Sequence, residues 1–96
     1  MAETVLAMTT LNPDGAAALD TYLRVVGPLM ERAGATLVQR YAVAAPLSGG
    51  GFPQFVSIME YPDADAVARV FDHPDYLALK PVIATAFSRY DVCVLS

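Results

Sequence analysis

The sequence has 96 residues, of which 55% are hydrophobic and 17% are charged, and its formal net charge is −4. This length predicts a single small domain over residues 1–96. The six basic residues are scattered along the chain, which argues against nucleic-acid binding, because that function needs a clustered basic surface.

The expected environment follows from what the sequence lacks. No apolar run approaches the ~18 residues of a membrane span, so we expect no membrane interaction. The N-terminus lacks a basic region followed by an apolar one, so we expect no signal peptide. A single cysteine, Cys93, excludes an internal disulfide and fits a reducing cytoplasm, where we expect the protein to reside.

The first half of the chain is predicted to form a strand and a helix. Residues Glu3–Thr10 carry apolar side chains on both faces, as a central strand does. Asn12-Pro13-Asp14 predicts a helix start, with Asn12 as the cap and Pro13 at the first helical position. Apolar residues then recur every three or four positions as far as Ala33, and Gly34 is expected to end the helix.

The second half is predicted to contain three strands and one helical region. A strand over Thr36–Ala45 is followed by a loop over residues 46–53 that contains three consecutive glycines. The next strand, Gln54–Tyr61, is apolar on both faces. Asp63 is expected to cap a helix, two further helical turns begin at prolines, and residues Tyr90–Leu95 form the last strand.

The order of these elements is strand, helix, strand, strand, helical region, strand. It predicts an α+β fold of the ferredoxin-like type, with a four-stranded antiparallel sheet and the first and third strands in its centre. The helices can cover only one face of such a sheet. Because the other face is also apolar, we expect a homodimer in which two sheets pack together as a dimeric α/β barrel.

Two short motifs resemble those of a known family. Glu60-Tyr61-Pro62 resembles a Glu-aromatic-Pro strand end, and Asp72-His73-Pro74-Asp75-Tyr76 resembles a later Asp-Ser-Pro-Glu-Tyr stretch, both found in the domain-of-unknown-function 1330 (DUF1330) family. A helical proline, Pro28, before the turn at residues 32–35 is similar as well. The sequence departs from the family at Ala35, where a second glycine is usual.

This family lies within the dimeric α/β-barrel superfamily, and it has no settled activity to transfer. Its superfamily relatives include cofactor-free monooxygenases of aromatic polyketides, lactone isomerases, dechlorinating lyases and haem-handling enzymes. The resemblance therefore implies the ferredoxin-like fold and a homodimer, but it does not select a reaction.

The candidate catalytic residues are His73, Tyr76 and Glu60. His73 stands at a helix break, and histidine is the side chain whose ordinary pKa lies near neutrality, so it is a candidate for proton transfer; the alternative is that it caps the following turn or lies in water. Tyr76 is a second candidate in the same stretch. Glu60 would need a partner if it faces inward, and Arg40 on the neighbouring strand could pair with it, either as a structural bridge or as the polar anchor of a pocket.

The candidate substrate-binding residues are Arg40, Tyr22 and Phe52. Arg40 could bind an oxyanion or a carboxylate. Tyr22 is one of five tyrosines, and such side chains orient phenolic or carbonyl ligands or simply straddle core and solvent. Phe52 would lie at the tip of the glycine-rich loop, which is either a floppy connection or a lid.

Metal and cofactor sites are not predicted. One histidine and one cysteine cannot build a zinc site, Cys93 is expected to lie in a buried strand, and the sequence contains no dinucleotide or phosphate-binding glycine motif. We therefore expect a protein that binds or converts a small apolar or aromatic metabolite without a cofactor, in a monooxygenase-, cyclase- or isomerase-like reaction. The alternative is a non-catalytic binding or dimerisation module.

Overall fold

The computed structural model describes all residues from 1 to 96. It contains four strands and four helices, in this order: β1 (Glu3–Leu11), α1 (Ala16–Ala33), β2 (Thr36–Ala42), β3 (Phe55–Tyr61), α2 (Ala64–Phe71), α3 (Pro74–Leu77), α4 (Lys80–Ala86) and β4 (Phe87–Leu95).

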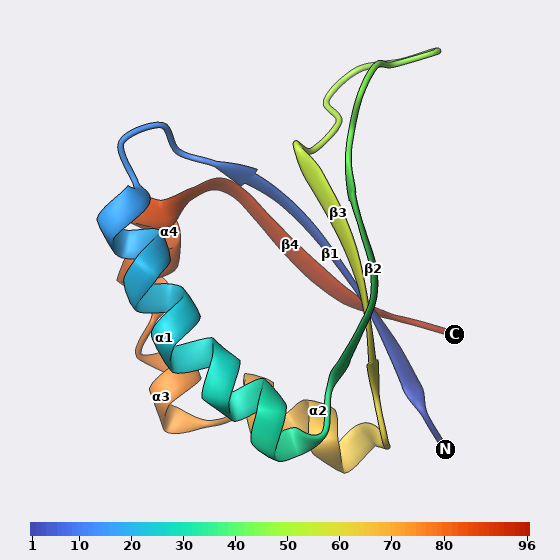
Figure 1. Ribbon diagram of the computed structural model, residues 1–96, viewed down its shortest axis with the longest axis vertical. Coiled ribbons are helices and arrows are strands. Elements are labelled where there is room, and N and C mark those ends of the chain that lie inside the picture. The colour runs from blue at the N-terminus through green and yellow to red at the C-terminus, as the bar shows by residue number, and fades with distance from the viewer.

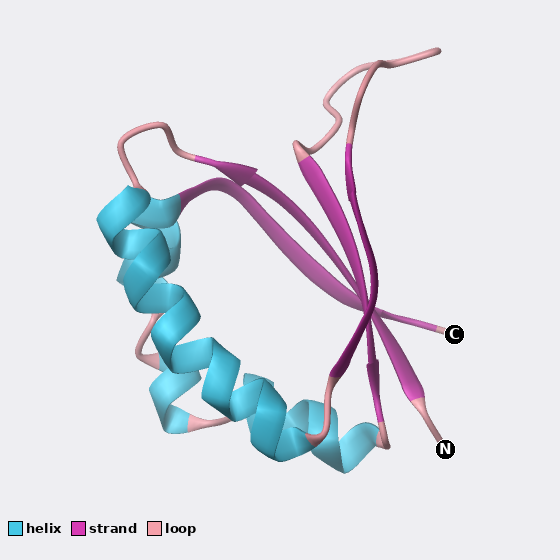
Figure 2. Ribbon diagram, viewed as in Figure 1, coloured by secondary structure: helices cyan, strands magenta, loops and turns pink.

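The four strands form one antiparallel sheet in the order β2-β3-β1-β4. All four helices lie on the same side of this sheet, as Figure 1 and Figure 2 show. This arrangement is the predicted ferredoxin-like fold, with β1 and β3 at the centre. The final strand begins at Phe87, three residues earlier than predicted.

The core lies between the sheet and the helices. Strand residues alternate between the two faces, so buried Val5 points to the helices while Leu6 points away from them. One cluster of buried side chains joins Val5 and Tyr61 of the sheet to α1 and α2. A second cluster joins Tyr22 of α1 to Phe87 of β4 and to the α3–α4 region.

Two helix-capping side chains were predicted, Asn12 and Asp63, and the prediction for Asn12 is wrong. Asp63 caps α2 as expected, because its carboxylate accepts a hydrogen bond of 2.7 Å from the amide of Ala66. Asn12, however, does not cap α1, which begins at Ala16. The side-chain amide of Asn12 instead donates to the carbonyl of Thr85 at 2.9 Å, so this side chain fixes the end of α4.

The sheet face opposite the helices is open in the single protomer. Leu6 and Met8 of β1, and Val56 and Ile58 of β3, share this face by their paired registers, and no helix covers them. Only 13 of the 96 residues are buried, so much of the apolar composition lies at the surface. Cys93 is exposed rather than buried, because β4 is an edge strand.

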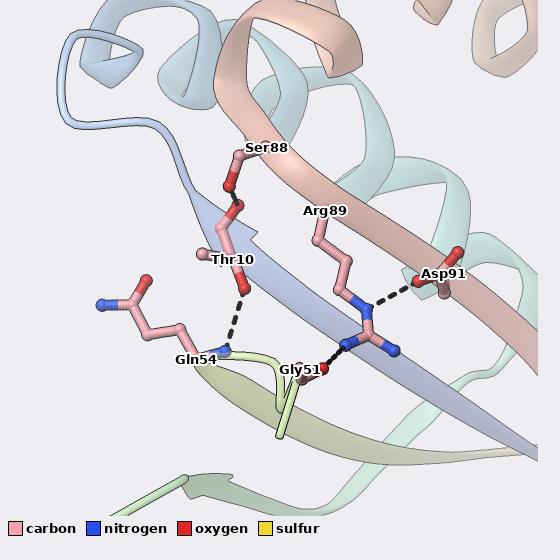
Figure 3. A network of polar contacts seen from close by, with 6 residues as sticks. All are labelled: Thr10, Gly51, Gln54, Ser88, Arg89 and Asp91. Atoms are coloured by element: carbon pink, nitrogen blue, oxygen red, sulfur yellow. Dashed lines mark hydrogen bonds and ion pairs between the residues drawn. The ribbon is translucent and has the colours of Figure 1, made fainter. Parts of the chain in front are cut away.

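The segment between β2 and β3 projects beyond the sheet (Figure 1). Its base is fixed by polar contacts shown in Figure 3: the amide of Gln54 donates to the hydroxyl of Thr10 at 3.0 Å, and the guanidinium of Arg89 donates to the carbonyl of Gly51. Arg89 is itself oriented by the carboxylate of Asp91 at 2.8 Å. The base of the segment is therefore held by β1 and β4, while its tip is exposed.

None of the four helices combines the length and the hydrophobicity that a membrane span requires.

Candidate functional site

Three tyrosine hydroxyls meet between the helices and the sheet. The hydroxyl of Tyr90, on β4, lies 2.8 Å from that of Tyr22 on α1 and 2.9 Å from that of Tyr76 on α3. Tyr90 is therefore the central member of a hydrogen-bonded chain that joins three elements far apart in the sequence.

The positions of these tyrosines follow from local structure. Tyr90 is paired with Thr9 of β1, and this pair lies on the same face as buried Val5, so its ring points to the helices. Tyr22 belongs to the buried stripe of α1 and packs edge-on against Phe87, with ring centroids 5.2 Å apart. The rings are thus held by aromatic packing while their hydroxyls bond to one another.

A cavity of about 450 Å³ opens beside Tyr76 and Tyr90. This volume falls in the range of small-molecule sites. The cavity has no charged side chain in its wall, which is formed by Val5, Val67, Phe71, Tyr76, Tyr90, Val92, Cys93 and Val94. A second cavity of about 320 Å³, nearer to α4, is also lined by Tyr76 and Tyr90. We refer to the larger one as the tyrosine cavity.

The tyrosines of this cluster are proton donors at neutral pH. Burial raises the pKa of Tyr22 to about 12 and raises the pKa of Tyr76 above its usual value. Burial and the neighbouring hydroxyls raise the pKa of Tyr90 further. These groups can donate hydrogen bonds to a ligand and polarise it, but they do not act as general bases near pH 7.

The sequence-predicted site residues do not all come together. Tyr22 and Tyr76 meet at Tyr90, which the sequence analysis did not single out. The signal that could have identified Tyr90 is its alternation with Val92 and Val94, since these three residues share the helix-facing side of β4.

His73 faces a different cavity. It lines a surface cleft of about 390 Å³ between α1 and α2, together with Arg32, Arg69 and Asp72. Its Nδ1 atom accepts a hydrogen bond of 3.0 Å from the amide of Asp75, so His73 caps α3. This is the structural role that the sequence left open for His73, and the histidine does not share a cavity with Tyr76.

Glu60 and Arg40 do not form the ion pair that the sequence allowed. A bulge between Leu37 and Gln39 inserts one extra residue into β2. Arg40 is consequently paired with Ser57 on the helix side of the sheet, whereas Glu60 is exposed on the open face. The guanidinium of Arg40 lies 4.4 Å from the centre of the Phe55 ring, so it makes a cation–π contact instead.

Phe52 lies in the projecting segment and is half-exposed. It does not line the tyrosine cavity, whose sheet residues belong to β1 and β4. No group of three or more histidine, cysteine, aspartate or glutamate side chains lies close enough together to hold a metal ion.

Known structures share this fold. The RPA0582 protein of unknown function from Rhodopseudomonas palustris is similar, with 26% identity, a TM-score of 0.81, and 98% of this chain matching 80% of that one. A dimeric ferredoxin-like protein of unknown function from Thermobifida fusca has 20% identity and a TM-score of 0.59 over 100% of this chain and 91% of its own. SnoaB, a cofactor-independent oxygenase from Streptomyces nogalater, has 14% identity and a TM-score of 0.62 over 99% of this chain and 91% of its own.

The last two of these similarities show the fold alone. No curated protein matches the sequence. The family comparison is decisive, because the model described as "Domain of unknown function (DUF1330)" matches residues 4–96, nearly the whole chain. The chain therefore belongs to the DUF1330 family, as its Glu60-Tyr61-Pro62 and Asp72–Tyr76 motifs predicted.

Proposed function

We propose that this protein is a homodimer that binds a small apolar or aromatic molecule in the tyrosine cavity without the help of a cofactor. The observation that supports this most directly is the wall of the cavity, which is wholly uncharged and includes Tyr76 and Tyr90, whose hydroxyls lie 2.9 Å apart. Apolar walls with a few placed polar groups are typical of small-molecule sites. A bound molecule would be oriented by hydrogen bonds from the tyrosines.

The chemistry available to this site is polarisation and proton donation. Tyrosine hydroxyls are protonated at neutral pH. Burial raises the pKa of Tyr22, Tyr76 and Tyr90 still further above neutrality. His73, Glu60 and Arg40 lie outside the cavity wall and have no part in this proposal. A monooxygenase-, cyclase- or isomerase-like reaction would therefore depend on the tyrosines and on a substrate that is reactive by itself. SnoaB, which shares the fold, is described as a cofactor-independent oxygenase.

Ligand binding can be tested with tetralin, a fused-ring hydrocarbon that suits the cavity in size and polarity. We expect amide resonances of Val67, Val92 and Val94 to shift in NMR spectra when tetralin is added. The variant Val67→Phe should weaken binding, because a larger side chain at this wall position fills the cavity. Leu23→Phe is the control, since Leu23 is exposed on α1 and lines none of the three cavities described.

Absence of any binding by the wild-type protein would overturn the proposal. It would favour the alternative that the fold serves dimerisation alone.

The dimer is proposed on the open face of the sheet. Leu6, Met8, Val56 and Ile58 lie there without a helix to cover them, and an apolar face of this kind is characteristic of a partner surface. Similar proteins from Bacteroides fragilis and Thermobifida fusca are described as dimeric. Two copies packed sheet to sheet would bury these side chains.

Sedimentation at low micromolar concentration tests this interface. We expect the wild-type protein to sediment as a dimer and Ile58→Lys to sediment as a monomer, because a charge at the centre of the face is costly to bury. Leu23→Lys carries the same charge change on the helix side and should stay dimeric. A monomeric wild-type protein would contradict the proposed interface.

A further inference from the structure

Two arginines without partners line the cleft of about 390 Å³ between α1 and α2. Of the five arginines in the chain, Arg24 and Arg89 form ion pairs with aspartates, and Arg40 packs over an aromatic ring. Arg32 and Arg69 form no ion pair, hydrogen bond or ring contact. We refer to the cleft that these two residues line as the arginine cleft. Like charges that share a cleft repel each other, so the arginine cleft favours a negatively charged ligand.

The ends of the two helices do not account for these arginines. Arg32 lies in the last turn of α1 and Arg69 in the last turn of α2, where a cation commonly bonds to the final carbonyls. Carbonyls at both helix ends already accept hydrogen bonds from the backbone amides that follow each helix, and neither guanidinium bonds to a carbonyl. Both guanidiniums are therefore free to bind a group that enters the cleft.

His73 adds a third donor to the arginine cleft, which it also lines. Its Nδ1 atom accepts a hydrogen bond of 3.0 Å from the amide of Asp75, so the proton of the neutral ring is carried by Nε2. Nε2 has no hydrogen-bond partner within the protein. The cap of α3 thus fixes the tautomer of His73 that leaves an N–H group available to a ligand.

The charge of the arginine cleft selects a ligand with one negative charge. Asp72 lines the cleft beside the two arginines, and it forms no ion pair with either of them. Two guanidiniums and one carboxylate leave one net positive charge, which a ligand carboxylate would neutralise. A phosphate with two charges would leave an excess negative charge next to Asp72. Guanidinium groups also bind carboxylates through paired hydrogen bonds.

The floor of the arginine cleft is apolar. Leu29 and Ala33 of α1 are 5% and 4% exposed, and Ala68 of α2 lines the cleft with them. An apolar body attached to the carboxylate would cover these side chains. Both helices lie on the same side of the sheet (Figure 1), so a dimer formed on the open face would leave the cleft accessible.

We propose that the arginine cleft binds a small monocarboxylic acid with an apolar body. Arg32 and Arg69 hold the carboxylate, and His73 donates a hydrogen bond to it through Nε2. The site is separate from the tyrosine cavity, because no residue lines both. The chain therefore carries a second binding site, which takes an acid where the tyrosine cavity takes an uncharged molecule.

The test compares benzoate with benzamide, which has nearly the same shape but no charge, in NMR titrations at pH 8. We expect benzoate to bind about tenfold more tightly, because charge-assisted hydrogen bonds to guanidinium groups contribute at least that factor. The amide resonances of Arg32 and Ala33 should shift, whereas those of Val92 and Val94 in the wall of the tyrosine cavity should not.

Two arginine variants and one control locate the charge effect. Arg32→Gln and Arg69→Gln should each weaken benzoate binding several-fold and leave benzamide binding unchanged. Arg24→Gln makes the same charge change on α1, at a residue that does not line the cleft, and should bind benzoate as the wild type does. All three positions are exposed, so these variants should keep the melting temperature of the wild type.

His73→Ser separates the cap of α3 from the binding role of the imidazole. Serine keeps an oxygen that can accept the hydrogen bond from the amide of Asp75, but it lacks the Nε2 donor. We expect an unchanged melting temperature and a several-fold loss of benzoate affinity. Unchanged benzoate affinity would show that His73 only caps the helix.

Three results would overturn the proposal. Equal binding of benzoate and benzamide would show that the arginines bind no carboxylate, and equal losses in Arg24→Gln and Arg69→Gln would show a general attraction to positive charge. Shifts at Val92 and Val94 instead of Arg32 and Ala33 would place benzoate in the tyrosine cavity. Tighter binding of phenyl phosphate, which carries two charges at pH 8, would refute the selection of a monocarboxylate. The tetralin titration is independent of these results, so either site can fail alone.

Discussion

The hydroxyl of Tyr76 lies 2.9 Å from the hydroxyl of Tyr90, and this contact joins helix α3 to strand β4 in the wall of the tyrosine cavity. A third hydroxyl, that of Tyr22, attaches α1 to the same point at 2.8 Å. The short helix α3 has no buried residue of its own. Its attachment to the sheet therefore depends strongly on this contact, while the ring of Phe71 on α2 packs against Tyr76 and joins the two helices.

Removing the central hydroxyl should weaken the fold. Tyr90→Phe deprives both Tyr22 and Tyr76 of their only hydrogen-bond partner, so we expect a loss of about 1–3 kcal/mol in the free energy of unfolding. Urea denaturation measures this change. Tyr41→Phe is the matched control and should leave the free energy of unfolding unchanged. Equal stability of the two variants would show that the hydroxyl chain does not stabilise the fold.

Stability should fall in alkaline solution. The pKa of Tyr22 and that of Tyr61 are about 12 in the folded protein, above the ordinary tyrosine value of 10.0 that is expected on unfolding. Between pH 10 and 12 the unfolded chain has lost protons that the folded chain retains, so raising the pH favours unfolding. The free energy of unfolding should fall by up to about 1.4 kcal/mol per pH unit for each of these groups. Their contribution is complete below pH 10 and is lost as the pH rises toward 12.

Urea titrations at pH 8, 10 and 11 would measure this dependence. The variant Tyr22→Phe should reduce the slope above pH 10, since one of the groups with a raised pKa is absent. A stability that is constant from pH 8 to 11 would contradict the burial of these hydroxyls.

The turn before α1 should tolerate no side chain at Gly15. A Cβ atom there would lie 2.6 Å from the carbonyl oxygen of Thr85, which is backbone and cannot move aside. We expect Gly15→Ala to cost about 1–3 kcal/mol through overpacking. Gly50→Ala, whose Cβ would meet no atom within 4 Å, is the control and should leave the melting temperature unchanged. A neutral Gly15→Ala variant would show that α4 does not approach this turn.

A pair of double-mutant cycles should distinguish the contacts of Arg40. The cycle of Arg40→Met with Phe55→Leu should give a coupling of about 0.5–1 kcal/mol, as expected for an exposed cation–π contact. The cycle of Arg40→Met with Glu60→Gln should give none, because these side chains lie on opposite faces of the sheet. A larger coupling in the second cycle would show that the bulge in β2 is absent.

Much of the fold could be predicted because its signals are local. Apolar residues on both faces identified β1 and β3 as central strands, the three- and four-residue spacing identified α1, and Asp63 identified the start of α2. Asn12-Pro13-Asp14 misled the prediction of α1, because the amide of Asn12 has a partner at the far end of the chain, the carbonyl of Thr85. A cap can be read from neighbouring residues, but a competing long-range hydrogen bond cannot.

The sequence by itself determined the order of the elements, the family and the excess of apolar surface, since composition and periodicity are properties of neighbouring residues. Only the tertiary structure decided which candidates meet. One inserted residue near Val38 turns Arg40 away from Glu60, because a shift of one residue in a strand exchanges its two faces. The folding of α1 and α3 onto β4 likewise brings Tyr22 and Tyr76 to Tyr90, across sequence separations of 68 and 14 residues that no local pattern spans.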